Sequence, residues 1–174
     1  MKITDIQEGE YAPYQKGYMS LVSPEWPLNE DLEVSLSNFV HFVRNIPMDK
    51  FDYRYAPGKW TVKDIIQHLI DSERVFAYRA LRFSRGDSTP LPGFDENLFA
   101  DNARGEGRHL TALLNELTLV RQSTISLFKS LNDDELLLTG TASGYTISVR
   151  ALGFAIIGHQ NHHVKIFEER YLNI

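Results

Sequence analysis

Apolar residues recur at intervals of three and four along four stretches of this chain, which is the spacing expected on one face of an α-helix. The stretches are residues 28–46, 61–85 and 110–131, and a fourth that begins after Thr146 or Ser148 and includes residues 158–170. No stretch shows a convincing alternation of apolar and polar residues, as a half-buried strand would. The pattern therefore predicts an all-α protein, and the most economical arrangement of four such helices is a four-helix bundle.

Local signals set the ends of two of these helices and describe the segments between them. Pro47 ends the first helix, because proline has no backbone N–H to donate. Thr61, followed three residues later by Asp64, has the spacing of a capping box and starts the second. Residues 1–27 show no clear period, so we expect an arm or a short helix laid over the domain. Residues 86–104 are too long for a minimal connection, and they either cover a site or form an ordinary surface excursion.

The composition is that of a globular protein, and we expect one domain over residues 1–174, since 43% of the residues are hydrophobic and 24% are charged. The formal net charge is -5 and Lys and Arg form no cluster, so we expect neither a nucleic acid nor a membrane as partner. The chain has no cysteine, so any thiol used in its chemistry comes from another molecule. The N-terminus lacks the pattern of a signal peptide, and we expect a cytoplasmic protein.

Two histidines four residues apart, His159 and His163, lie in the fourth helical stretch. Because a helix turns about 100° per residue, both side chains point to the same side, which is also the apolar side. Two neutral imidazoles on an apolar face lose hydration unless each finds a partner, and a transition metal satisfies both at once. A catalytic site of the zinc type uses about three protein ligands and leaves one position open. The third ligand must therefore come from another helix.

His68 is the best candidate for this third ligand, because it lies in the middle of the second helix beside the apolar stripe. His41 and His109 lie on positions that we expect to be exposed. His162 is a rival to His163, but its position at the side of the stripe favours a supporting or surface role. Imidazole suits zinc, nickel, copper and iron alike, so the residues do not identify the metal. The predicted metal ligands are His68, His159 and His163.

The surroundings of these histidines identify no catalytic residue. Gln160 follows His159, so the general-base glutamate of the HExxH zinc proteases is missing. The second imidazole nitrogens need acceptors, and the nominal candidates are Asp71, Glu73 and Glu168. Carboxylates at such positions are more often solvated helix charges. Ser72 and Arg79 are placed to orient a substrate carboxylate, although a polar border of the helix is the simpler interpretation.

Three stretches of the chain resemble the DinB-like superfamily, and its YfiT-like branch in particular. They are residues 11–22 (YAPYQKGYMSLV), residues 51–94, which include IIQHLIDSE, and residues 141–172, which include GHQNHHVKIFEER. The resemblance implies a four-helix bundle with up-down-down-up connectivity, and members commonly look like homodimers. It also implies a divalent metal, often nickel or zinc, held by one histidine of the second helix and two of the fourth. On this chain those residues are His68, His159 and His163.

The resemblance implies two activities. Some relatives are similar to metal-dependent transferases that join a low-molecular-weight thiol, such as bacillithiol, mycothiol or glutathione, to an electrophile, and others resemble hydrolases. A metal with an open position lowers the pKa of a bound thiol or a bound water, so both fit the residues. We favour thiol transfer, because a metal-activated thiolate needs less proton shuttling than water does. The third alternative is a non-enzymatic bundle, either stabilised by a metal or serving as a stress-response binding protein.

Overall fold

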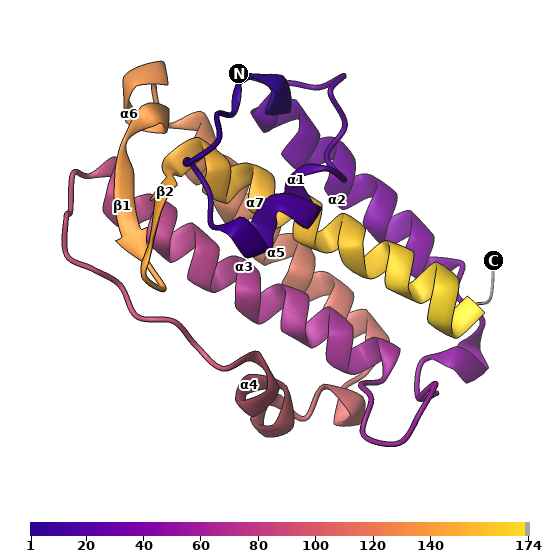
Figure 1. Ribbon diagram of the computed structural model, residues 1–174. Coiled ribbons are helices and arrows are strands. Elements are labelled where there is room, and N and C mark those ends of the chain that lie inside the picture. Colours follow the sequence, from indigo (N-terminus) through magenta and orange to yellow (C-terminus); the bar gives the residue numbers. More distant parts are fainter. Residues whose placement is uncertain (173–174) are drawn as a thin grey trace.

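The computed structural model describes residues 1–172, and four long helices dominate it (Figure 1). They are α2 (Leu28–Arg44), α3 (Val62–Ser84), α5 (Leu110–Lys129) and α7 (Val149–Ile166). Both α2 and α3 contact α5 as well as α7, so the four helices enclose a common core. The four helices predicted from the apolar spacing are confirmed, and they form a bundle.

Side chains at the helix starts explain where two of these helices begin. The Thr61 hydroxyl accepts a hydrogen bond from the Asp64 backbone N–H at 3.1 Å, and the Asp64 carboxylate accepts one from the Thr61 N–H at 3.0 Å. This is the predicted capping box. Ser148 caps α7, because its hydroxyl accepts a hydrogen bond from the Ala151 N–H at 3.1 Å. Such caps contribute about 1 kcal/mol each. Between the two candidates, Ser148 rather than Thr146 is therefore the cap.

The prediction that the chain forms no strand is wrong at residues 139–148. Strands β1 (Thr139–Ala142) and β2 (Tyr145–Ser148) form an antiparallel hairpin in which Ala142 pairs with Tyr145. Its turn consists of Ser143 and Gly144, with φ of 53° and 83°, and positive φ at both positions matches the right-handed twist of a hairpin. Each strand has only four residues, which is too short for an alternating pattern to stand out.

The segment predicted as a long connection, residues 86–104, contains a helix of its own, α4 (Glu96–Ala103). Asp95 caps it, because its carboxylate accepts hydrogen bonds from the N–H groups of Asn97 and Leu98. The helix contacts α3, but none of its residues is buried, so it carries no apolar stripe to reveal it in the sequence. A further short helix, α6 (Asp133–Leu137), precedes the hairpin.

The N-terminal segment lies over the bundle as expected, and its short helix α1 (Lys16–Met19) crosses α7 (Figure 1). The crossing requires a glycine, since a Cβ added at Gly158 would lie 2.2 Å from the Tyr18 carbonyl oxygen. Glu10 also ties this segment to α7, because its carboxylate accepts hydrogen bonds from Arg150 at 2.5 and 2.8 Å. Within residues 1–172, no helix combines the length and the apolar character needed to cross a membrane.

Two apolar clusters fill the bundle, one toward each end. Helix α3 contributes residues 62–70 to one cluster and residues 76–83 to the other, and residues 149–157 of α7 join the second. Between the clusters, α3 and α7 bury a layer of polar side chains that includes the histidines of the predicted site. The histidines of the predicted site therefore lie between the two apolar clusters, where α3 packs on α7.

Candidate metal centre

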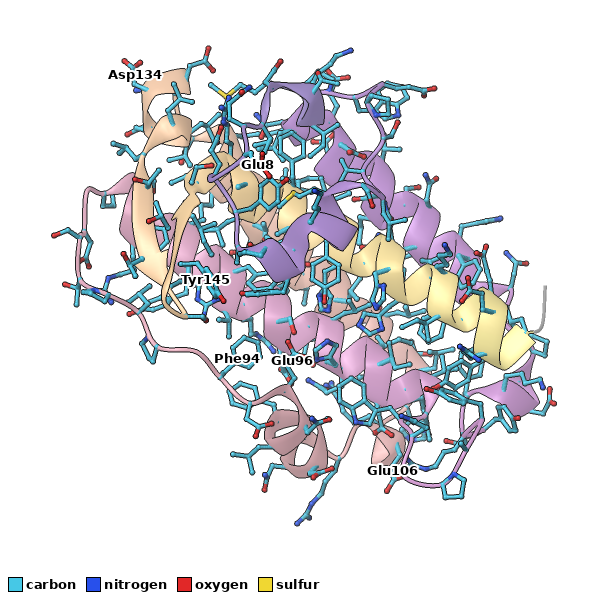
Figure 2. All side chains as sticks on the ribbon, in the orientation of Figure 1. Glu8, Phe94, Glu96, Glu106, Asp134 and Tyr145 are labelled. Carbon is cyan, nitrogen blue, oxygen red and sulfur yellow. The ribbon has the colours of Figure 1, made fainter. Side chains whose placement is uncertain are left out.

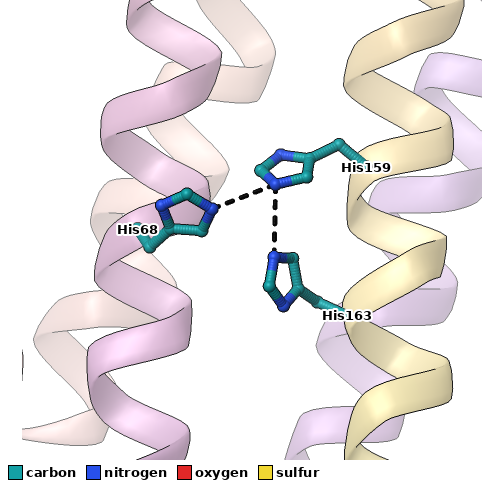
Figure 3. A group of neighbouring side chains, drawn as sticks. All are labelled: His68, His159 and His163. Atoms are coloured by element: carbon teal, nitrogen blue, oxygen red, sulfur yellow. Dashed lines mark hydrogen bonds between the residues drawn. The ribbon is translucent and has the colours of Figure 1, made fainter. Parts of the chain in front are cut away.

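Three imidazole rings meet in this polar layer, one from α3 and two from α7 (Figure 3). Nε2 of His159 lies 3.0 Å from Nε2 of His68 and 3.2 Å from Nε2 of His163. The side chains are buried, with exposed fractions of 4% for His68, 4% for His159 and 7% for His163. The structure thus brings together the three histidines that the sequence predicts as ligands.

Aromatic rings pack against two of the three imidazoles, those of His68 and His159. The Trp60 ring packs on His68, with 4.9 Å between the ring centroids. Tyr18 and Phe76 pack on His159, at centroid distances of 5.1 and 6.0 Å. The N-terminal segment therefore contributes to the site through Tyr18, which the sequence pattern alone does not indicate.

Burial keeps all three imidazoles uncharged. It lowers the pKa of His68 to about 4, and it lowers the pKa of His159 and His163 well below the usual range, with a smaller contribution from the neighbouring histidines. At neutral pH each ring therefore has a nitrogen lone pair available. Neutral imidazole is the form that binds metals.

The geometry fits a divalent cation. Three nitrogens around a tetrahedral zinc ion, each about 2.0–2.1 Å from it, are separated by about 3.3 Å. The two spacings from Nε2 of His159 are close to this value, and one ring nitrogen from each of the three histidines lies within 4.8 Å of the others. The Nδ1 atom of His68 lies 3.4 Å from the Ser72 hydroxyl, which suits an imidazole whose Nε2 is directed at a metal. Nδ1 of His163 is buried and has no hydrogen-bond partner in residues 1–172. Without a cation, the nitrogen lone pairs of the three neutral imidazoles would face one another and be poorly satisfied by hydrogen bonds.

The carboxylates near the triad serve other partners. Asp71 accepts a hydrogen bond from Gln67 at 3.0 Å, and Glu73 accepts one from Arg121 at 2.8 Å. Across the described chain, no histidine of the triad hydrogen-bonds a carboxylate. Of the two interpretations left open for Asp71, Glu73 and Glu168, the structure does not support the role of acceptors for the imidazoles.

The other histidines lie where the sequence predicts. His41 and His109 are exposed on the surface of the molecule. His162 is half-buried, with its ring 5.4 Å from that of Tyr18 and 5.2 Å from that of His163, but it is outside the group of converging nitrogens. His163, rather than its rival His162, completes the triad.

Comparison with known proteins agrees with this architecture. The family model of the DinB superfamily matches residues 31–167. The chain belongs to the DinB superfamily. Its structure is similar to that of YfiT from Bacillus subtilis, a probable metal-dependent hydrolase with an unusual four-helix bundle topology. The TM-score is 0.67 and the sequence identity is 19%, and the match covers 82% of this chain and 85% of YfiT.

A second similar structure is the mycothiol-dependent maleylpyruvate isomerase, with a TM-score of 0.61, 18% identity and 84% of this chain covered. The chain spans 61% of the isomerase. At these identities the likeness establishes the fold alone. Among curated proteins, none matches the sequence.

A buried ion pair in this DinB superfamily protein supports the turn of α7 that carries the histidines. Arg121 is 1% exposed, and its Nε donates to Glu73 at 2.8 Å while its Nη2 donates to the Gln160 side-chain oxygen at 3.0 Å. The Gln160 amide in turn donates to the Ser35 carbonyl at 2.9 Å. The network links α2, α3, α5 and α7 directly beside His159. In the sequence, the one sign of this network is that Arg121 lies within the apolar stripe of α5.

The two larger cavities that reach the triad of this superfamily member have different linings. One, of about 230 Å³, is lined by His163 together with Trp60 and Tyr171. The other, of about 360 Å³, is lined by His159 and Arg79 among others. Residues 93, 94 and 96 form part of the wall of the second cavity. The segment at residues 86–104 therefore borders this cavity, and its role as the cover of a site stays a prediction.

Proposed function

We propose that this protein is a metal-dependent enzyme in which His68, His159 and His163 hold a divalent cation, nickel or zinc, and which transfers a low-molecular-weight thiol to an electrophile. The observation that carries the proposal is the convergence of three buried, uncharged imidazoles on one point, with Nε2 atoms 3.0 and 3.2 Å apart. A cation with an open position lowers the pKa of a bound thiol and so supplies a nucleophile at neutral pH.

The number of ligands supports a catalytic site over a purely structural one. Structural zinc sites commonly have four protein ligands, whereas catalytic sites have three and leave one position for another molecule. Within the described residues, the group that contains His68 has three members. The cavities beside His159 and His163 provide space for a small molecule next to the site. A closed, inert site is the alternative that these two observations disfavour.

Thiol transfer is favoured over hydrolysis by the absence of a base in contact with the triad, since no carboxylate of the described chain hydrogen-bonds these histidines. The similar isomerase depends on mycothiol, which also supports a thiol cosubstrate. Hydrolysis is the second candidate. It is favoured by the likeness to YfiT and by Glu96, a carboxylate that lines the cavity of His159 and whose pKa is raised by burial, as a general base requires.

Elemental analysis of the purified protein tests the metal site. We expect one divalent cation per chain, and we expect His68→Ala and His163→Ala to lose it. His162→Ala is the matched control, because this residue is adjacent in sequence but outside the triad, and it should keep its metal. Full metal content in His68→Ala would remove His68 from the ligand set.

A screen of electrophiles against several thiols, before and after treatment with a chelator, tests the activity. We expect turnover that depends on both the thiol and the metal. Turnover with water alone that the chelator abolishes would favour the hydrolase, and activity that survives removal of the metal would contradict both versions of the proposal.

We also infer the up-down-down-up connectivity of the family. It is supported by two contacts. Leu28, at the start of α2, lies near Gly153 in the first turns of α7, and Phe42, near the end of α2, stacks on Phe167, the residue that follows α7. This pairing corresponds to parallel directions for α2 and α7. The homodimer rests on the family resemblance, and sedimentation at several concentrations tests it.

A further inference from the structure

The cavity beside His159 contains a buried cationic side chain without an anionic partner. Arg79 is 2% exposed, and its Nη2 donates to the Pro92 carbonyl at 2.9 Å and to the Ser143 hydroxyl at 3.1 Å. Both acceptors are neutral. No carboxylate of residues 1–172 forms an ion pair with Arg79.

The other two buried arginines show what this position lacks. Arg121 pairs with Glu73 at 2.8 Å, and Arg150 pairs with Glu10 at 2.5 Å. Removing a cation from water is strongly unfavourable unless an anion compensates it. Burial accordingly lowers the pKa of Arg79. The fold therefore pairs two of its buried arginines internally and leaves the third directed at a cavity.

The position of Arg79 on α3 relates it to the triad. Arg79 follows His68 by eleven residues, which corresponds to about 20° around the helix and about 16 Å along it, so both residues lie on the same face. Side chains on a helix lean toward its N-terminus, which brings the guanidinium nearer to His68. Phe76, His159 and Arg79 line one continuous cavity. A molecule that reaches from the Arg79 guanidinium to the triad is therefore shorter than about 16 Å.

The remaining walls suit a small polar ligand. Three tyrosines line the cavity: Tyr14, Tyr18 and Tyr145. Phe94 faces the Arg79 guanidinium at 5.9 Å from its ring centroid. The labelled Phe94, Glu96 and Tyr145 lie near one another beside α3 (Figure 2). Glu96, the carboxylate in this wall, forms no ion pair with Arg79 and leaves the guanidinium available.

We propose that Arg79 binds a carboxylate group of a small ligand in this cavity, so that one cosubstrate of the reaction is a carboxylate-bearing molecule whose reactive end reaches the histidine triad. Guanidinium and carboxylate form paired, charge-assisted hydrogen bonds in a fixed geometry, which also orients the ligand. The inference rests on the proposed function for the role of the triad, but the binding of a carboxylate at Arg79 is a separate property.

Titration of the protein with succinate, followed by calorimetry, tests the binding, with succinamide as the uncharged analogue. We expect succinate to bind and succinamide to bind at least about tenfold more weakly. Arg79→Met should lose about tenfold or more in succinate affinity. Arg79→Lys keeps the positive charge but lacks the planar set of N–H donors, so its affinity for succinate should lie between those of the unaltered protein and Arg79→Met. Arg85→Met, at the exposed residue that follows the same helix, is the control and should bind as the unaltered protein does.

The same titration after removal of the metal separates this inference from the proposed function. Succinate binding that persists without metal but depends on Arg79 supports the inference, whatever the activity screen shows. Absence of succinate binding, equal affinity in Arg79→Met, equal binding of succinamide, or binding lost with the metal would each overturn it. If Arg79→Met does not fold by circular dichroism, Arg79→Lys and Arg79→Gln carry the comparison.

Steady-state kinetics with Arg79→Lys then distinguishes the two sources of the carboxylate. A KM raised for the thiol alone assigns the carboxylate to the thiol, and a KM raised for the electrophile alone assigns it to the electrophile. A purely structural role would instead lower kcat or stability without changing either KM selectively, and it would contradict the inference.

Discussion

The buried pair of Glu73 and Arg121 allows a quantitative test of how the site is supported. Replacing Glu73 with leucine removes the carboxylate and leaves the Arg121 guanidinium buried with neutral acceptors only. The two residues are 4% and 1% exposed, so water cannot replace the lost acceptor. Breaking a buried ion pair in this way costs about 3–5 kcal/mol. We therefore expect Glu73→Leu to lower the free energy of unfolding by about 4 kcal/mol, or nearly a thousandfold in the folding equilibrium.

Urea unfolding of the metal-free protein, followed by circular dichroism, measures this loss. With a denaturant dependence of about 2 kcal/mol per molar urea, the midpoint should fall by about 2 M. The surface pair of Arg74 and Glu116 joins the same two helices at 2.7 Å and is the matched control. Its side chains are 49% and 26% exposed, so Arg74→Met should cost less than about 1 kcal/mol.

A double variant separates the buried charge from the loss of packing. Glu73→Leu combined with Arg121→Met removes both charges and should recover much of the lost stability, because a buried ion pair is often replaceable by apolar residues. A loss in Glu73→Leu no larger than in Arg74→Met would refute the reasoning. So would a double variant as unstable as the sum of its two single changes.

Three further predictions concern stability. Burial lowers the pKa of His68 from 6.5 to about 4, so in metal-free protein the folded state binds fewer protons at His68 than the unfolded chain does. The free energy of unfolding should therefore fall as the pH drops from about 6.5 to about 4. Urea titrations at several pH values should show a smaller fall in His68→Asn than in the unaltered protein. Burial raises the pKa of Asp31 to about 6 and its Oδ2 has no partner within residues 1–172, so Asp31→Asn should raise the melting temperature at pH 7, with a gain that vanishes toward pH 4. Gly158→Ala places a Cβ against the Tyr18 carbonyl, so hydrogen exchange should show faster opening of residues 16–19 while α3 and α5 stay protected.

The local pattern of the sequence determines the four helices and part of the site. The apolar stripe of each helix repeats within a few residues, so it is visible without knowledge of any partner. The alignment of His159 with His163 follows from the helical turn in the same way. His68 is predictable because it lies beside the stripe of its own helix, and the family resemblance points to the same residue.

Tertiary packing decides the features that join distant segments. Arg79 meets Ser143, and Arg121 meets Glu73 and Gln160, across separations of 39 to 64 residues that no periodicity records. The hairpin at residues 139–148 and helix α4 are too short or too exposed to carry a pattern of their own. Backbone geometry sets the spacing of side chains within one helix, whereas the packing of helices sets which side chains face one another. The same difference explains why the histidine pair can be predicted from the sequence, while the cavity that connects it to Arg79 becomes visible only in the folded protein.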